Sequence, residues 1–191
     1  MTRAALVDIV VKVGGGLLAS PGHLDAVLTA LADAASTRRL LVIPGGGPFA
    51  DAVREVDREL ALPAAAAHWM AILAMDQYAH LLASRLRTAG LASDTAGIAA
   101  QIDQGRLPVL APFRWLRDAD PLPHSWDVTS DSIAAWVAGA VGARRLVLVK
   151  PPGAGDQAVD PYFHRVLTPE IPPPLVVAAD QIGALRRSLT V

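Results

Sequence analysis

The sequence contains no cysteine, and its basic and acidic residues nearly cancel. The first absence excludes disulfides, thiolate metal sites and cysteine nucleophiles. With 17 basic and 18 acidic residues the net charge is −1, so no bulk electrostatic attraction to nucleic acid or to a membrane is expected. Apolar stretches are interrupted before they reach the ~18 residues of a membrane span. The first one contains Asp8 and Lys12, unlike a secretory leader. We therefore expect a soluble, cytoplasmic protein without nucleic-acid or membrane partners.

Lysine is nearly absent too, because only Lys12 and Lys150 represent it among the 17 basic residues. Arginine takes every other basic position in this alanine- and arginine-rich chain. The two lysines are therefore candidates for places that need a compact ammonium group rather than a planar guanidinium. Chance is the alternative explanation.

The remaining composition is that of a folded domain. Apolar residues make up 52% of the 191 residues, charged residues make up 18%, and the mean hydropathy is +0.36. Disorder requires the opposite balance, and a chain of this length can bury a sizeable core. We expect a single domain over residues 1–191.

Short β-branched runs alternate with helical patterns along the chain. Strands are predicted at residues 6–13, 40–43, 107–111, 145–149 and 175–177, and helices at 20–35, from 48 onward, and at 64–88, 98–104, 128–141 and 180–188. This alternation is typical of an α/β fold, a three-layer α/β/α sandwich with a mainly parallel central sheet.

A strand, a triple glycine and a helix follow one another twice. The first unit ends in Gly14, Gly15 and Gly16, and the second ends in Gly45, Gly46 and Gly47. Bare backbone amides before a helix N-terminus can bind an anion. Two such loops in one parallel sheet could face one another at the carboxyl ends of the strands, where ligands of open α/β sheets bind. The alternative is that each loop is only a tight turn.

Neither loop carries a dinucleotide-binding or P-loop pattern. Lys12 precedes its glycines, whereas the lysine of a P-loop follows them. On a strand Lys12 points away from Val11 and Val13, so it could neutralise charge that develops during phosphoryl transfer. A lysine that merely reaches solvent at a sheet end is the alternative.

Residues 125–132 carry the second chemical signal. Asp127 and Asp131 are four residues apart at a predicted helix start, which places both carboxylates on one helix face. Asp131 could hold a lysine ammonium, and Asp127 could instead cap the helix. His68, on the long predicted helix, could line an acceptor pocket or simply pack. The histidines show no metal-ligand spacing, so no protein metal site is predicted.

Residues 10–18, 41–51 and 127–150 together resemble the amino acid kinase superfamily, in which these motifs occur in this order. The resemblance covers roughly residues 5–150. It implies that Lys12 contacts the transferring phosphoryl group and that Asp131 organises the lysines. It also implies that the first glycine loop binds ATP phosphates and that the second binds the acceptor.

Further similarity, at residues 44–60, 68–78 and 125–132, is to the branch that makes aminomethylfuran diphosphate for methanofuran-type cofactors. The resemblance therefore implies a kinase that uses ATP and Mg²⁺ to convert a small phosphate monoester, aminomethylfuran methyl phosphate, into a diphosphate. Residues 1–125 would bind the acceptor and residues 126–191 the nucleotide. A homodimer through helix 64–88 is expected.

The chain departs from the family pattern after the late strand. Lys150 is followed by two prolines, and only Gly153 remains of the usual Asp-Gly turn. The further lysine that many members carry near the nucleotide is absent, so Lys150, or an arginine such as Arg165, would supply that charge. Two alternatives stay open. One is a non-catalytic ligand- or oxyanion-binding relative, and the second is a kinase for another carboxylate or phosphate acceptor.

Overall fold

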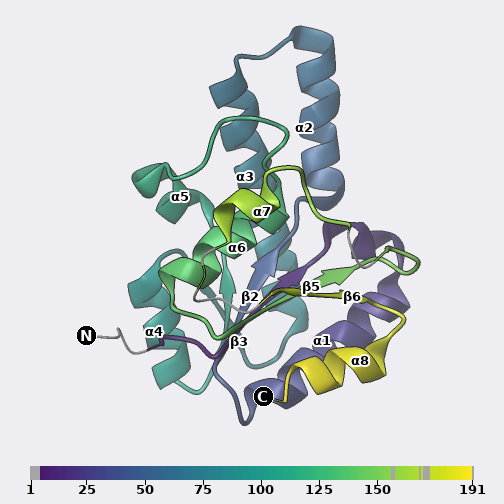
Figure 1. Ribbon diagram of the computed structural model, residues 1–191, viewed down its shortest axis with the longest axis vertical. Helices are drawn as coiled ribbons and strands as arrows, with labels where there is room; N and C mark the ends of the chain where they lie inside the picture. The colour runs from purple at the N-terminus through teal and green to yellow at the C-terminus, as the bar shows by residue number, and fades with distance from the viewer. Residues whose placement is uncertain (1–4, 156–157, 168, 170–172, 191) are drawn as a thin grey trace.

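A central parallel sheet organises the molecule (Figure 1). The computed structural model describes residues 5–155, 158–167, 169 and 173–190. Within them, six strands pair in the order β3-β4-β2-β1-β5-β6, and every pairing is parallel. The strands are β1 (Ile9–Val13), β2 (Leu40–Pro44), β3 (Ala89–Ala92), β4 (Leu107–Leu110), β5 (Arg145–Lys150) and β6 (Leu175–Ala178). The predicted parallel sheet is confirmed.

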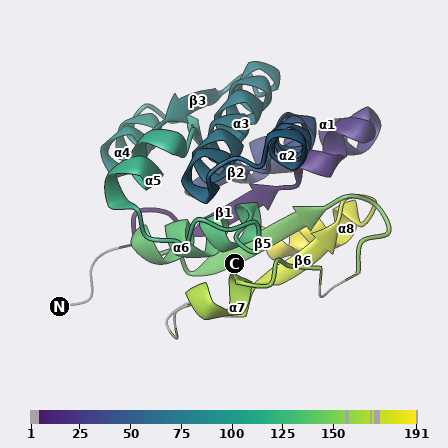
Figure 2. The same cartoon turned by 90° about the horizontal axis from the view of Figure 1, so that it is seen from above.

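Helices cover both faces of this sheet, which confirms the predicted three-layer sandwich (Figure 2). They are α1 (Pro21–Ala35), α2 (Gly47–Leu60), α3 (Ala64–Arg85), α4 (Thr95–Asp103), α5 (Phe113–Ala119), α6 (Ser130–Ala140), α7 (Phe163–Val166) and α8 (Ile182–Ser188), and a 3₁₀ turn, η1, spans Gly15–Ala19. Helices α1 and α8, with the end of α3, cover one face, and α4 and α6 cover the other. None of the helices among the described residues is long and apolar enough to cross a membrane.

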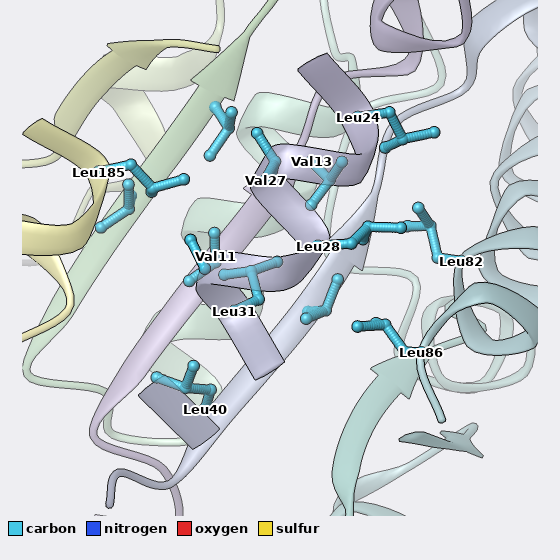
Figure 3. Close-up of a cluster of buried hydrophobic side chains, with 14 of the residues drawn as sticks. Val11, Val13, Leu24, Val27, Leu28, Leu31, Leu40, Leu82, Leu86 and Leu185 are labelled. Carbon is cyan, nitrogen blue, oxygen red and sulfur yellow. The ribbon is translucent and has the colours of Figure 1, made fainter. Parts of the chain in front are cut away.

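The apolar core has two parts, one on each face of the sheet. Figure 3 shows the part in which Val11 and Val13 of β1 meet leucines of α1, α3 and α8. Val10 points to the other part, beside Leu148 of β5. Because side chains alternate along a strand, Lys12 shares the face of Val10 and not that of its two valine neighbours. The predicted direction of Lys12 is thereby confirmed.

Strand register brings the two glycine loops to the same edge of the sheet. Lys12 lies opposite Ile43 of β2 and Leu148 of β5. Strands β1, β2 and β5 run in parallel, so the segments that follow them leave from neighbouring positions. The site described below is built at this edge.

Strand β3 is the main departure from the expected pattern. The long helix was expected to reach residue 88, but α3 ends at Arg85 because Leu86 has extended backbone angles. The chain then adds β3 to the edge of the sheet beside β4. A Cβ atom at Gly90 would lie 1.8 Å from Oε1 of Gln101, so the glycine lets α4 pack against this strand.

Helices α2 and α3 form an antiparallel hairpin that extends beyond the strand ends (Figure 1). The apolar face of α2 is only partly buried. Phe49, Val53 and Val56 are half-buried, and the Leu60 residue is 68% exposed.

Candidate functional site

Two lysines and one aspartate form a buried charge cluster on the α6 side of the sheet. Lys12 Nζ lies 3.0 Å from Asp131 Oδ1, and Lys150 Nζ donates a 2.6 Å hydrogen bond to Asp131 Oδ2. The lysines come from the neighbouring strands β1 and β5, and Asp131 comes from the first turn of α6. A carboxylate is stable at that helix position because it faces the positive end of the helix dipole.

The electrostatics of this cluster follow from its burial. As whole residues, Lys12 is 5% exposed, Asp131 is 3% exposed and Lys150 is 9% exposed. Burial lowers the pKa of Lys12 below its ordinary value, Lys150 lowers it further, and Asp131 counteracts both. Burial alone would raise the pKa of Asp131, but the two ammonium groups outweigh it and hold that pKa below the usual range. The cluster carries one net positive charge when all three groups are ionised.

The two glycine loops touch one another beside this cluster. Gly14 N–H donates to Val149 O and Gly45 N–H donates to Val13 O, both at 2.8 Å, which fixes each loop to the adjacent strand. A Cβ atom on Gly15 would lie 2.0 Å from the backbone nitrogen of Gly47. Only glycine permits this approach. The expectation that the loops face one another at the strand ends agrees with this geometry.

Several backbone amides in the loops remain available to a ligand. Among the described residues, the N–H groups of Gly15, Gly16, Gly46 and Gly47 donate to no other backbone group. Gly47 opens α2 with a φ of +56°, a conformation that favours glycine. The first amides of a helix lack partners inside the helix. Two sets of amide donors therefore meet at this point, beside a cluster of positive charge.

A cavity of about 390 Å³ extends from the glycine loops along the α2–α3 hairpin. Gly15, Gly16, Gly46 and Gly47 line its floor, and its other walls come from α2, α3 and residues 124–133. The wall includes apolar side chains such as Ile72 of α3. The size suits a small ring with its substituents rather than a macromolecule.

Imidazole rings form one wall of the cavity. His68 of α3 stacks on His124, with ring centroids 4.4 Å apart, and Trp69 packs edge-on against both. His124 in turn lies 2.9 Å from Asp120 Oδ1. Burial, followed by the neighbouring His124, lowers the pKa of His68 to about 4. His68 is therefore a neutral hydrogen-bonding group at neutral pH, in the place where the sequence suggested an acceptor pocket.

A carboxylate and an indole form another part of the wall. Trp126 Nε1–H donates a 2.7 Å hydrogen bond to Asp57 Oδ2, and Leu62 N–H donates to Asp57 Oδ1 at 3.0 Å. Arg54 lies over the Trp126 ring at 4.8 Å from its centroid, and its Nη1 pairs with Asp51 at 2.9 Å. Sequence analysis missed this group, since Asp57 and Trp126 are 69 positions apart.

Asp160 is a second residue that the sequence did not indicate. This buried carboxylate accepts hydrogen bonds from Thr129 N and Oγ1 at 3.0 and 2.8 Å and from Ser132 N at 3.0 Å. Ser132 Oγ and, at 3.2 Å, Tyr162 N also donate to it. Asp160 therefore ties the segment after β5 to the N-terminus of α6, which carries Asp131.

Two expected site residues, Asp127 and Gly153, belong neither to the charge cluster nor to the glycine loops nor to the cavity lining. Asp127 precedes α6, which begins at Ser130, so helical spacing does not place it on one face with Asp131. Its side chain is exposed, and the capping function considered for it belongs to Asp160. Gly153 is also exposed, in a turn with a φ of +76°.

The segment after β5 carries Arg165, the arginine considered as a source of positive charge for the nucleotide. Its side chain is exposed and lies over the Tyr162 ring. Earlier in this segment, Pro151 abuts the first glycine loop, because a Cβ atom on Gly16 would lie 2.7 Å from Pro151 Cγ. No group of three or more potential metal-ligating side chains occurs within the described parts of the chain.

This geometry can hold two anionic groups close together. Each glycine loop offers amide donors, and a net positive cluster lies beside them. Such an arrangement stabilises charge that develops between two bound anions, and it needs no reorganisation during the reaction.

Comparisons with known proteins also identify similarity to kinases. The model of the family described as "Amino acid kinase family" matches residues 9–151. A curated relative from Methanocaldococcus jannaschii, named (5-(aminomethyl)furan-3-yl)methyl phosphate kinase, is 30% identical over 140 residues, which cover 73% of this chain and 63% of the relative. The chain thus spans less than two thirds of the length of that relative.

Solved structures show the same fold. A uridylate kinase from Archaeoglobus fulgidus superposes with a TM-score of 0.71 at 14% identity, over 95% of both chains. A UMP kinase from Ureaplasma parvum gives a TM-score of 0.69 at 15% identity, again over 95% of both chains. At such identities the likeness concerns the fold alone.

Proposed function

This chain belongs to the amino acid kinase family, and we propose that it transfers the γ-phosphoryl group of ATP to a small anionic acceptor. The observation that carries the proposal is the Lys12–Asp131–Lys150 cluster beside two touching glycine loops. Phosphoryl transfer requires positioning and charge neutralisation more than covalent chemistry. The cluster and the loop amides supply both.

The proposed reaction is an in-line displacement. An acceptor oxygen forms a bond to the γ-phosphorus while the bond from that phosphorus to the β–γ bridging oxygen breaks, and ADP leaves. A phosphate or carboxylate acceptor is already ionised, so no general base is needed. Lys12 would neutralise charge on the transferring group, and Asp131 would hold Lys12 and Lys150 in position.

The nucleotide would bind through the first glycine loop. Gly14, Gly15 and Gly16 form a backbone cradle that side chains would fill, and two of the three have free amides. Lys150 would supply the charge on this side, and Gly153 would belong to the turn beside the nucleotide. Mg²⁺ keeps several waters and binds mainly through substrate phosphates, so the nucleotide would carry it.

The acceptor would bind in the cavity above the second glycine loop. Gly46 and Gly47, which line the cavity, would hold its anionic group together with Gly45, and His68 would contact its body. We propose a phosphate monoester that becomes a diphosphate. The support is the name of the Methanocaldococcus jannaschii relative, a kinase of (5-(aminomethyl)furan-3-yl)methyl phosphate. The chain would then serve the synthesis of a methanofuran-type cofactor in the cytoplasm.

The proposed boundary at residue 125 between acceptor-binding and nucleotide-binding segments is not sharp. Residues 1–125 would bind the acceptor and residues 126–191 the nucleotide, but the cavity also takes lining from residues 124–133. Asp127 would act on the acceptor only at the rim of the cavity, because its side chain is exposed. We further propose a homodimer through α3, on which Leu73 is 41% exposed.

A non-catalytic anion-binding relative is the second candidate. The segment that follows Lys150 favours it, because Pro151 stands against the first glycine loop where other members carry an Asp-Gly turn. In that case the glycine loops would bind an oxyanion without turnover. A kinase for another carboxylate or phosphate acceptor is the third candidate.

The test is ADP release from Mg-ATP with a panel of acceptors: the aminomethylfuran phosphate, isopentenyl phosphate, UMP, carbamate and acetylglutamate. We expect turnover with the first acceptor and a loss on the order of 100-fold or more in Lys12→Ala. Arg87→Ala, which removes an exposed basic side chain, is the matched control and should retain activity. Calorimetric ATP binding without turnover on any acceptor would favour the non-catalytic candidate. Wild-type rates in Lys12→Ala would remove Lys12 from the mechanism.

A further inference from the structure

Helix α2 presents one line of polar groups to the cavity. Gly47, Asp51, Arg54 and Asp57 follow one another at three- or four-residue spacing and all line it. Asp51 and Arg54 form an ion pair with each other. Asp57 has no ion pair among the residues that the structure describes. One carboxylate of the acceptor cavity thus has no ion-pair partner within the described part of the chain.

The hydrogen bonds of Asp57 hold it in place without neutralising it. Its two donors, Trp126 Nε1–H and Leu62 N–H, are both uncharged. An ionised carboxylate has about four acceptor sites, so capacity remains for a donor from a ligand. The Trp126 ring, which also lines the cavity, lies beside this carboxylate. Arg54 already lies over the Trp126 ring, so a cationic group of a ligand would pair with the Asp57 carboxylate.

The cavity therefore has opposite polarity at its two ends. Free amides and the positive end of the helix dipole lie at Gly47, where the lysine cluster is near. Asp57 is ten residues further along α2, which places it about 15 Å away along the helix axis. A hydrogen bond takes up about 3 Å at each end, so about 9 Å remains for the ligand between its two polar groups. This span fits one small ring with a substituent at each end.

We propose that Asp57, oriented by Trp126, binds a cationic group at the end of the acceptor opposite its phosphate. The acceptor class is then a small zwitterion, with an ammonium group, a planar apolar middle and a phosphate monoester. This inference rests on the proposed function, and it assigns the acceptor specificity to Asp57, a residue within the stretch 44–60 that resembles the aminomethylfuran branch. The stacked rings of His68 and His124 would face the planar middle.

The competing explanation is purely structural. Through the same two hydrogen bonds, Asp57 joins the turn after α2 to the segment that carries Trp126. A structural carboxylate would matter equally for every acceptor, whereas a binding carboxylate would matter only for a cationic one. Two acceptors of the same shape separate the cases: the aminomethyl and the hydroxymethyl forms of the furan methyl phosphate.

The experiment measures KM by ADP release, and Kd by calorimetry, for both acceptors with wild type and Asp57→Asn. In wild type the aminomethyl acceptor should bind at least about 10-fold more tightly than the hydroxymethyl one, as expected for a charged hydrogen bond. Asp57→Asn should remove most of this preference by weakening only the aminomethyl acceptor. Glu59→Gln, which neutralises an exposed carboxylate on the same helix, should keep it.

Each outcome decides between the two explanations. Equal loss for both acceptors in Asp57→Asn, or equal affinity in wild type, would overturn the inference. If the asparagine amide disturbs folding by facing an N–H donor, the double variant Asp57→Asn/Trp126→Phe removes the indole donor and repeats the comparison. A wild type that binds both acceptors without turnover would contradict the proposed kinase activity. The calorimetric preference would still test Asp57 in that case.

Discussion

Lys150 Nζ lies 2.6 Å from Asp131 Oδ2, between side chains that are only 11% and 5% exposed. The same carboxylate pairs with Lys12 through its other oxygen. Asp131 therefore fixes the distance between two ammonium groups that belong to adjacent strands. Lys12 lies on β1 just before the first glycine loop, and Lys150 ends β5 just before the segment that we propose lies beside the nucleotide. The proposed contribution of Lys150 to nucleotide binding can therefore be tested by substitution.

Lys150→Met should weaken ATP binding about 10-fold, because a charged contact to phosphate is lost while a flexible side chain of similar length remains. Asp131 keeps Lys12 as a partner, so the fold should survive. Calorimetry with ATP measures the change, and thermal unfolding monitors the fold. Unchanged ATP affinity would make Lys150 a structural partner of Asp131 alone.

His68 should make stability depend on pH between about 6.5 and 4. Burial lowers the pKa of the folded imidazole to about 4, whereas the ordinary value is 6.5. Below pH 6.5 the unfolded chain binds a proton that the folded protein resists, so stability falls as the pH falls through this range. Because His68 is only 9% exposed, solvent screens this effect little, and the cost at pH 4 is at most about 3 kcal/mol.

Denaturant unfolding of wild type and His68→Gln at pH 7, 5.5 and 4 measures this effect. The variant should lose part of the pH slope, because its amide does not titrate. His80→Gln is the matched control, since His80 is exposed on the same helix. Parallel slopes in wild type and His68→Gln would show that the stacked pair with His124 tolerates protonation.

Asp160→Ala should lower both stability and turnover. The variant leaves the donors of Thr129 and Ser132 without their acceptor at the start of α6, and losing a cap costs about 1 to 2 kcal/mol. Asp131 lies in that first turn, so its position relative to the lysines should change as well. A fall in kcat with little change in acceptor KM is the expected kinetic result.

Asp94→Ala provides the comparison for that variant. Asp94 caps α4 by accepting from Gly97 N–H at 2.7 Å, on an element that does not line the cavity. It should lose similar stability and keep its turnover when both variants are assayed well below their melting temperatures. Equal turnover in the two variants would limit Asp160 to a structural function.

Much of the fold could be predicted because its signals are local. Strand and helix periodicity gave the parallel sheet, and the repeated glycine unit indicated where the loops would meet. Strand β3 was missed because the Ala89–Ala92 segment owes its conformation to pairing with β4 and to the close approach of α4. Neither contact leaves a periodic pattern in four residues.

The charge cluster was predictable for a similar reason, since rare lysines at strand ends and an acid at a helix start are visible in one sequence. Asp160 and the Asp57–Trp126 pair were not, because their partners are 28 to 69 positions away. Asp127 was assigned to the face of Asp131 on helical spacing, but α6 begins only at Ser130. Asp160, from a distant part of the chain, accepts the hydrogen bonds at the first turn of that helix.

Among glycine-to-alanine substitutions in the two loops, Gly15→Ala should disrupt the site most. The new Cβ atom would lie 2.0 Å from Gly47 N and 2.3 Å from Gly47 Cα, and both neighbours are backbone atoms that cannot rotate away. The loops would have to separate, which moves the free amides of both. We expect loss of ATP binding and of turnover by at least about 100-fold, with destabilisation of about 1 to 3 kcal/mol from overpacking.

Gly22→Ala is the matched control, because nothing lies within 4 Å of its added Cβ on α1. It should keep full activity and gain about 0.5 to 1 kcal/mol from better helix propensity. Calorimetry, ADP release and thermal unfolding on both variants make the comparison. If Gly15→Ala bound ATP like wild type, the contact between the glycine loops would not be required for the site.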